Sequence, residues 1–302
     1  MSDLHPLAGI YAAAVTPLKP DSTLDLEAVP VFLQLLAARG CHGILIFGTT
    51  GEGPSFSPKE REVLLRSVRV YRQQFPGFRL LAGTGTPSLS ETIDLTKLAF
   101  DIGYDGVVVL PPYYFRKATD EGLFKWFSEL ITKAVPKDKY LLGYHIPSMT
   151  GVGFSLDLLA RLKDAFPTQF AGIKDSSHDE SFAIDLGKRF GKDLLVLTGT
   201  DSYLHHSLKN HAQGAITAPA NIISDGLREI WDLYQQGKDP SKAQARVTEQ
   251  RHILDKYIPF PTVLKALLPR LFKLPHWSLK PPLEEMDEEK VEQAWREFSE
   301  TL

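Results

Sequence analysis

A lysine that directly follows an apolar segment has the most distinctive chemistry in this chain. Lys174 comes after residues 170–173, whose composition is that of a buried strand. Burial at the end of such a strand disfavours a charged amine and can lower its pKa from about 10.4 toward neutrality. A neutral amine condenses with a carbonyl to form a Schiff base. A solvated lysine at a strand end is the alternative that this position leaves open.

Hydroxyl groups follow two other apolar segments. Residues 140–144 end at Tyr144, whose phenol can relay protons. Residues 43–47 run into the glycine-rich stretch 48–53, which contains Thr49 and Thr50. Two hydroxyls and several backbone N–H groups in such a turn can hold a carboxylate or an oxyanion. A half-buried core tyrosine and a turn with helix-capping threonines are the structural alternatives.

The elements around these residues follow a regular order, in which short β-rich apolar segments alternate with longer amphipathic ones. The expected strands cover residues 9–15, 43–47, 79–82, 106–110, 140–144, 170–173, 194–197 and 215–217. Expected helices begin at Asp25 and Ser57 and cover residues 88–100, 119–134, 155–166, 179–190, 202–210 and 225–236. Strands that are apolar on both faces favour a closed (β/α)₈ TIM barrel over an open sheet.

The predicted barrel would bring the reactive residues together, because active sites of such barrels lie at the C-terminal ends of the strands. Thr49, Tyr144 and Lys174 all follow strands at that end. Residues 1–237 are predicted to form the catalytic barrel domain. Residues 238–302 are predicted to form a C-terminal helical extension, with helices over 241–257, 261–272 and 287–298.

Composition narrows the class of protein. The formal net charge of −3 provides no basic field for nucleic acid or anionic lipid. The single cysteine, Cys41, precludes an intramolecular disulfide and fits a reducing compartment. The first residues lack the pattern of a secretory signal, and no apolar run reaches the length of about 18 residues typical of a membrane span. We therefore expect a cytoplasmic enzyme without nucleic-acid or membrane partners.

The motifs and their spacing resemble those of the dihydrodipicolinate synthase and N-acetylneuraminate lyase superfamily, the pyruvate-dependent class I aldolases. The resemblance runs from about Leu7 to about Pro282. The motifs that carry it are Thr16-Pro17, Gly48-Thr49-Thr50-Gly51-Glu52, Leu110-Pro111-Pro112-Tyr113-Tyr114, Tyr144-His145-Ile146-Pro147-Ser148, Gly172-Ile173-Lys174-Asp175, Thr198-Gly199-Thr200-Asp201 and Pro261-Thr262-Val263-Leu264-Lys265.

The resemblance implies catalytic roles for four residues and a substrate-binding role for Thr50. Lys174 matches the Schiff-base lysine, and Tyr144 matches the proton-shuttling tyrosine. Thr49 matches the threonine that hydrogen-bonds this tyrosine, and Thr50 matches the one that grips the pyruvyl carboxylate. Tyr114 matches a tyrosine that, in the synthases, enters the active site of the neighbouring subunit and completes a proton relay.

The resemblance also implies the surroundings of the reaction. Gly199 and Ile216 match positions that line the keto-acid pocket. The partners are a small 2-oxo acid and an aldehyde, and the assembly is a homotetramer, a dimer of tight dimers. Neither a metal nor an organic cofactor is expected, apart from the covalent pyruvyl imine on Lys174 during turnover.

Several positions concern the recognition of the aldehyde substrate. Met149 stands where synthases have an arginine that binds the carboxylate of aspartate semialdehyde, and methionine cannot form such a charge-assisted pair. His145 replaces a common asparagine and either bears on the pocket or packs behind the strand. Arg116 either supplies another anion contact or is solvated. Asp201 either binds substrate hydroxyls or caps the helix that begins at Ser202.

Together these residues predict a Schiff-base-forming lyase of the class I aldolase type, favouring a 2-oxo-3-deoxy sugar acid aldolase or dehydratase. The alternative is 4-hydroxy-tetrahydrodipicolinate (dihydrodipicolinate) synthase, which condenses pyruvate with aspartate semialdehyde. A non-catalytic keto-acid-binding barrel is a third hypothesis, but such a pocket has no need of a reactive amine.

Two rival enzyme classes fit the sequence poorly. A metal-dependent aldolase needs converging ligands. The histidine cluster His205-His206 lies on a predicted helix, where neighbours point about 100° apart. A phosphate-binding isomerase barrel needs glycine-rich loops after strands seven and eight, whereas Asp201 places an acid in the first of these loops.

Overall fold

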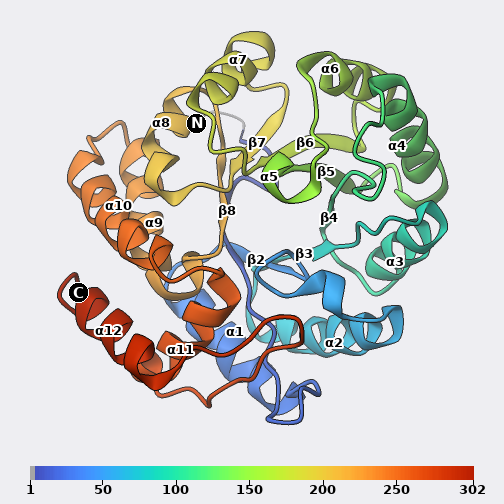
Figure 1. Cartoon of the computed structure of the whole chain (residues 1–302). Coiled ribbons are helices and arrows are strands. Elements are labelled where there is room, and N and C mark those ends of the chain that lie inside the picture. Colours follow the sequence, from blue (N-terminus) through green and yellow to red (C-terminus); the bar gives the residue numbers. More distant parts are fainter. Residues whose placement is uncertain (1–3) are drawn as a thin grey trace.

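A closed barrel of eight parallel strands forms the centre of the chain in the computed structural model, which describes residues 4–302 (Figure 1). Each strand pairs with the next in the sequence, and β1 pairs with β8 to close the barrel. This confirms the predicted (β/α)₈ fold. The strands are β1 Gly9–Ala13, β2 Gly43–Ile46, β3 Arg79–Gly83, β4 Gly106–Val109, β5 Tyr140–His145, β6 Phe170–Asp175, β7 Leu195–Thr198 and β8 Gly214–Thr217.

Helices alternate with these strands and surround the barrel, apart from the short α5 near the centre of the view (Figure 1). They are α1 Val29–Ala38, α2 Pro58–Tyr71, α3 Leu89–Asp101, α4 Asp120–Ala134, α5 Pro147–Thr150, α6 Leu156–Ala165, α7 Glu180–Phe190, α8 Leu204–Lys209 and α9 Ala220–Gln235. Short 3₁₀ turns cover Leu26–Ala28, Gly53–Ser55, Arg72–Gln74 and Asp201–Tyr203. The amphipathic pattern places the apolar face of each outer helix against the sheet, and this forms the main hydrophobic core.

Element boundaries depart from the predicted ones where backbone pairing or a kink overrides the apolar pattern. β5 and β6 continue past the predicted ends, because Tyr144 pairs with Lys174 and His145 with Asp175 in the parallel ladder. The last barrel helix begins at Ala220, five residues earlier than Asp225 and before a kink at Ile223. The single turn α5 was not predicted.

The C-terminal helices α10 Ser241–Asp255, α11 Phe260–Phe272 and α12 Glu288–Ser299 follow the barrel (Figure 1). α10 packs against α9, and α11 contacts both α9 and α12. Within residues 4–302, no helix is both long and apolar enough to cross a membrane.

A buried ion pair joins this extension to the loop after β2. Lys265 Nζ on α11 lies 2.5 Å from Glu52 Oε1 and donates to the carbonyl of Ser278 at 2.7 Å. Glu52 Oε2 accepts from the backbone N–H of Lys280 at 2.8 Å. The two side chains are only 2% and 0% exposed. The loop that carries Thr49 is therefore anchored to residues more than two hundred positions away.

Loss of this anchor is expected to be costly. Lys265→Met leaves the Glu52 carboxylate buried without its cation, which should lower the free energy of unfolding by about 3–5 kcal/mol. Lys133→Met is the control: Lys133 pairs with Glu129 on an exposed face, and such a pair contributes about 0.5 kcal/mol. Urea unfolding measures both. Equal losses in the two variants would contradict a stabilising role for the buried pair.

Candidate active site

The ends of β5 and β6 bring the lysine and the tyrosine together. The parallel register places Tyr144 directly beside Lys174. Lys174 Nζ lies over the Tyr144 ring, 4.1 Å from its centroid, within the range of a cation–π contact. The lysine is 3% exposed and the tyrosine 4%. The amine therefore faces the phenol inside the barrel end rather than bulk solvent.

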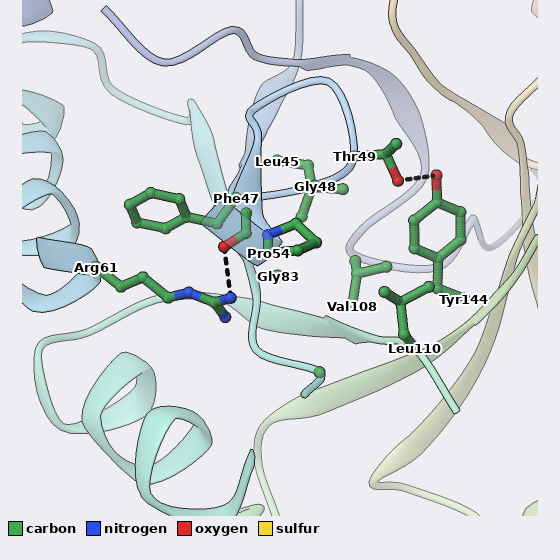
Figure 2. A pocket seen from close by; sticks show the side chains of 12 residues that line it. Leu45, Phe47, Gly48, Thr49, Pro54, Arg61, Gly83, Val108, Leu110 and Tyr144 are labelled. Atoms are coloured by element: carbon green, nitrogen blue, oxygen red, sulfur yellow. Dashed lines mark hydrogen bonds between the residues drawn. The ribbon is translucent and has the colours of Figure 1, made fainter. Parts of the chain in front are cut away.

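The loop after β2 adds a hydroxyl to this pair. Thr49 Oγ1 lies 3.4 Å from the Tyr144 hydroxyl oxygen, and Figure 2 shows the two groups pointing toward one another. Thr16 Oγ1 donates to the Gly51 carbonyl at 2.7 Å, which holds the loop against the chain after β1. Glu52 adopts a left-handed backbone conformation (φ 56°) that reverses the chain after the threonines. Thr50 is buried beside them.

Arg61 of α2 supports the same loop from the other side (Figure 2). Its Nη2 donates to the Gly53 carbonyl at 2.5 Å, and its Nε donates to the Phe56 carbonyl at 3.3 Å. An enclosed cavity of about 20 Å³ lies between Arg61 and the pair formed by Thr49 and Tyr144. This volume has room for about one water molecule.

The electrostatics of the site act mainly on the Tyr144 phenol. Burial raises its pKa, but the adjacent Lys174 charge lowers it, as does hydrogen bonding to Thr49, Lys174 and Ser176. The lowering contributions win, and the pKa of Tyr144 lies below its ordinary value of 10.0. A phenol that gives up its proton more readily is suited to general acid–base work.

These groups line one cavity of 490 Å³ at the C-terminal end of the barrel. Its volume is in the usual range for small-molecule sites. The predicted site residues that line it are Thr49, Thr50, Tyr144, Met149, Lys174, Gly199 and Ile216. Gly199 leaves room for its neighbour, because a Cβ at this position would overlap the Ser176 side chain.

Asp201 does not contact this cavity, which corrects the predicted role in substrate binding. Its side chain is 0% exposed, and its Oδ2 accepts a hydrogen bond from Arg251 Nη1 at 2.7 Å. This ion pair holds Asp201 behind the cavity wall. The alternative that Asp201 caps a helix does not hold either, because Thr200 is the N-cap of the 3₁₀ turn that starts at Asp201.

Three other predicted positions lie outside the cavity of the single chain. Tyr114 is 77% exposed and packs edge-to-face on Phe115. His145 packs behind its strand, where its Nδ1 accepts from the Phe154 N–H at 2.9 Å and its ring stacks on Phe182. Arg116 is exposed, and its aliphatic stem lies against Gly151.

Several lining residues were missed by the sequence analysis. Ser176 and His178 follow β6, and Arg251 and Asp255 come from α10. The spacing of Arg251 and Asp255 indicates an ion pair on one helix face. The sequence holds no signal that this face covers the mouth of the barrel.

Comparison with known proteins places the fold and site in one enzyme class. Residues 6–300 match the model of the dihydrodipicolinate synthetase family. An uncharacterized DapA-like lyase of Chloroflexus aurantiacus is 36% identical over 284 residues, covering 94% of this chain and 93% of the relative. A 4-hydroxy-tetrahydrodipicolinate synthase of Prochlorococcus marinus is 33% identical over 78% of this chain and 76% of its own length.

Solved structures agree with this result. Dihydrodipicolinate synthase from Agrobacterium tumefaciens has a TM-score of 0.87 and 32% identity, covering 97% of this chain and 99% of its own. YagE from E. coli, solved in complex with pyruvate, has a TM-score of 0.91 over 98% of both chains, but at 23% identity it supports the fold alone. These matches place the chain among the lyases. The chain belongs to the dihydrodipicolinate synthetase family.

The lowered pKa of Tyr144 can be tested by ultraviolet difference titration of the wild type against Tyr144→Phe. The Tyr144 phenolate is expected to appear below pH 10, because Lys174 favours the ionised form. Lys174→Met removes that charge while burial remains, so the pKa of Tyr144 should rise above its wild-type value. Lys133→Met, a substitution on the exposed face of α4, should leave the pKa of Tyr144 unchanged. An unchanged titration in Lys174→Met would contradict this account.

Proposed function

We propose that the protein is a Schiff-base-forming lyase that joins or separates pyruvate, or a related 2-oxo acid, and an aldehyde. The favoured activity is that of a 2-oxo-3-deoxy sugar acid aldolase or dehydratase. The observation that carries the proposal is the buried Lys174 amine, 4.1 Å from the centroid of the Tyr144 ring, inside a cavity at the C-terminal end of the barrel. Because 4-hydroxy-tetrahydrodipicolinate synthases are among the relatives, that synthase activity is the second candidate.

The chemistry begins at Lys174. The Lys174 amine, once it has lost its proton, attacks the ketone carbon of pyruvate, and loss of water leaves a protonated imine that acts as an electron sink. Loss of a proton from the methyl carbon then gives an enamine. Tyr144 is the group placed to move protons here, because its phenol adjoins the amine and its pKa lies below 10.0.

The enamine carbon forms the new bond to the aldehyde carbon, and the aldehyde oxygen takes up a proton. Water then hydrolyses the imine, which frees the product and restores Lys174. Reversal of these steps cleaves a 2-oxo-3-deoxy sugar acid. Thr49 orients the Tyr144 hydroxyl at 3.4 Å, and Thr50 with its neighbouring backbone N–H groups holds the carboxylate of the 2-oxo acid.

The side chain at position 149 argues against aspartate semialdehyde. Met149 lies on the cavity wall and is 62% exposed, so it is positioned at the mouth. A thioether cannot form the bidentate, charge-assisted pair that an arginine makes with a carboxylate. Arg116, the other candidate from the sequence, is outside the cavity. An acidic aldehyde would therefore lack its expected partner.

Assembly, location and cofactor use complete the proposal. The enzyme is proposed to work in the cytoplasm as a homotetramer, without metal or organic cofactor. The adjacent aromatic side chains of Tyr114 and Phe115, 77% and 75% exposed, fit a surface that another subunit covers. Tyr114 would complete a proton relay in that neighbour. Neither Lys174 nor Tyr144 requires a metal for the steps described.

Borohydride reduction of the enzyme with pyruvate, in buffer containing a chelator, tests the covalent step. A stable three-carbon adduct on Lys174 is expected by mass spectrometry, because the reduced imine no longer hydrolyses. Lys174→Ala should show no adduct. Lys163→Ala should retain it, since this half-buried lysine donates to backbone carbonyls outside the cavity. An unmodified wild-type protein would favour the non-catalytic keto-acid-binding barrel.

The neighbour-donated relay is tested by Tyr114→Phe, which removes one hydroxyl. Turnover should fall about a hundredfold, the usual contribution of a positioned proton donor. Phe115→Leu alters the adjacent exposed side chain without removing a proton donor and is the control. Steady-state kinetics with pyruvate and an aldehyde give the comparison. Equal kinetics for wild type and Tyr114→Phe would remove Tyr114 from the mechanism.

A further inference from the structure

The active-site cavity is much larger than its pyruvate-binding end. Lys174, Tyr144 and the two threonines occupy that end, whereas the rest of the 490 Å³ extends toward residues of the C-terminal extension. Arg251, Asp255 and Phe260 belong to this far wall, together with His178 from the loop after β6. Arg251, Asp255 and His178 have no part in the proposed imine formation. They lie where the aldehyde that is joined to the 2-oxo acid would bind.

Arg251 is a donor group whose charge is already compensated. Its Nη1 lies 2.7 Å from Asp201 Oδ2, its Nε lies 2.8 Å from Asp255 Oδ1, and its guanidinium rests on the Phe260 ring at 4.8 Å. Guanidinium has five N–H donors, and these two bonds occupy two of them. The side chain is only 7% exposed, so it is held in place with donors still available to a ligand.

Charge balance at this wall disfavours an anion. One guanidinium faces two carboxylates, which leaves an excess of one negative charge. Asp201 Oδ1 adds to this potential, because it is buried and has no hydrogen-bond partner among residues 4–302. A phosphate or carboxylate brought to Arg251 would meet this excess charge at short range in a partly desolvated site.

The same groups suit hydroxyls, which donate and accept at once. Arg251 offers N–H donors, and the half-exposed Asp255 carboxylate offers acceptors. His178 adds an uncharged ring near neutral pH, since burial, followed by the Arg251 charge, lowers its pKa. Its Nδ1 lies 3.3 Å from Thr200 Oγ1, which orients the ring.

We propose that Arg251, Asp255 and His178 form an acceptor subsite that selects an uncharged, hydroxylated aldehyde and discriminates against phosphorylated and carboxylated ones. The inference rests on the proposed aldolase function and narrows its substrate class. Asp255 is the specificity-determining residue, because its carboxylate offsets the charge of Arg251, the cation at this far wall. Asp201 holds Arg251 from behind the wall and acts as a positioning residue.

Pyruvate-dependent condensation with glyceraldehyde and with glyceraldehyde 3-phosphate tests this subsite. The wild type should have the larger kcat/KM for glyceraldehyde. Asp255→Asn should raise the ratio of kcat/KM for the phosphorylated over the neutral aldehyde at least about tenfold, because it removes a unit charge near the phosphate. Because the same ratio of kcat/KM values is compared between the wild type and the variant, differences in the intrinsic reactivity of the two aldehydes cancel.

Asp232→Asn is the matched control. Asp232 pairs with Arg228 at the same i,i+4 spacing on α9, outside the cavity. In Asp232→Asn, the ratio of kcat/KM for the phosphorylated over the neutral aldehyde should stay within about twofold of the wild-type value, since distant exposed charges are screened. Equal ratios in the two variants would overturn the subsite, as would a wild-type preference for glyceraldehyde 3-phosphate.

Borohydride trapping with pyruvate alone, measured on the same preparations, separates this inference from the function beneath it. A wild-type enzyme that forms no adduct removes the proposed function and the subsite with it. An enzyme that forms the adduct but shows the same ratio in Asp255→Asn and Asp232→Asn keeps the proposed function and loses the subsite alone.

Discussion

The contact between an amine and the face of a phenol is the constraint on which this active site depends. Lys174 is almost completely removed from water, and a buried amine is costly unless other groups compensate it. The Tyr144 ring, 4.1 Å from the amine to its centroid, supplies part of that compensation. The contact also has a chemical consequence, because the Lys174 charge lowers the pKa of the Tyr144 phenol.

The fold produces this contact through strand register. In parallel pairing, residues opposite one another have side chains on the same face of the sheet, so Tyr144 and Lys174 point together into the barrel end. Thr49 reaches the same end because β2 also stops there. Its loop needs further support, since the glycines at positions 48, 51 and 53 have no side chains to pack. Lys265 supplies that support by binding Glu52 from the extension.

Sequence alone was sufficient for the barrel and for the residues at strand ends. The alternation of apolar segments gave the strand order, and the C-terminal ends of parallel strands meet in any such barrel. Specific roles for Thr50 and Tyr114 came from resemblance to a family, because spacing cannot distinguish a capping threonine from a carboxylate ligand. The error at Asp201 has a physical cause: its partner Arg251 lies fifty residues later, and only the folded chain shows that α10 packs against the 3₁₀ turn that carries Asp201.

The barrel and the C-terminal extension supply different parts of the cavity wall. The proposed imine chemistry uses residues of β5 and β6, which the backbone ladder holds in place, and of the loop after β2. The proposed acceptor end uses α10 and the start of α11, whose residues line the cavity without taking part in strand pairing. A substitution such as Asp255→Asn can therefore alter charge at the far wall while leaving the strand ladder intact. On the proposed mechanism, substrate choice can change in this architecture without disturbing Lys174, because different elements of the fold would hold the two ends of the substrate.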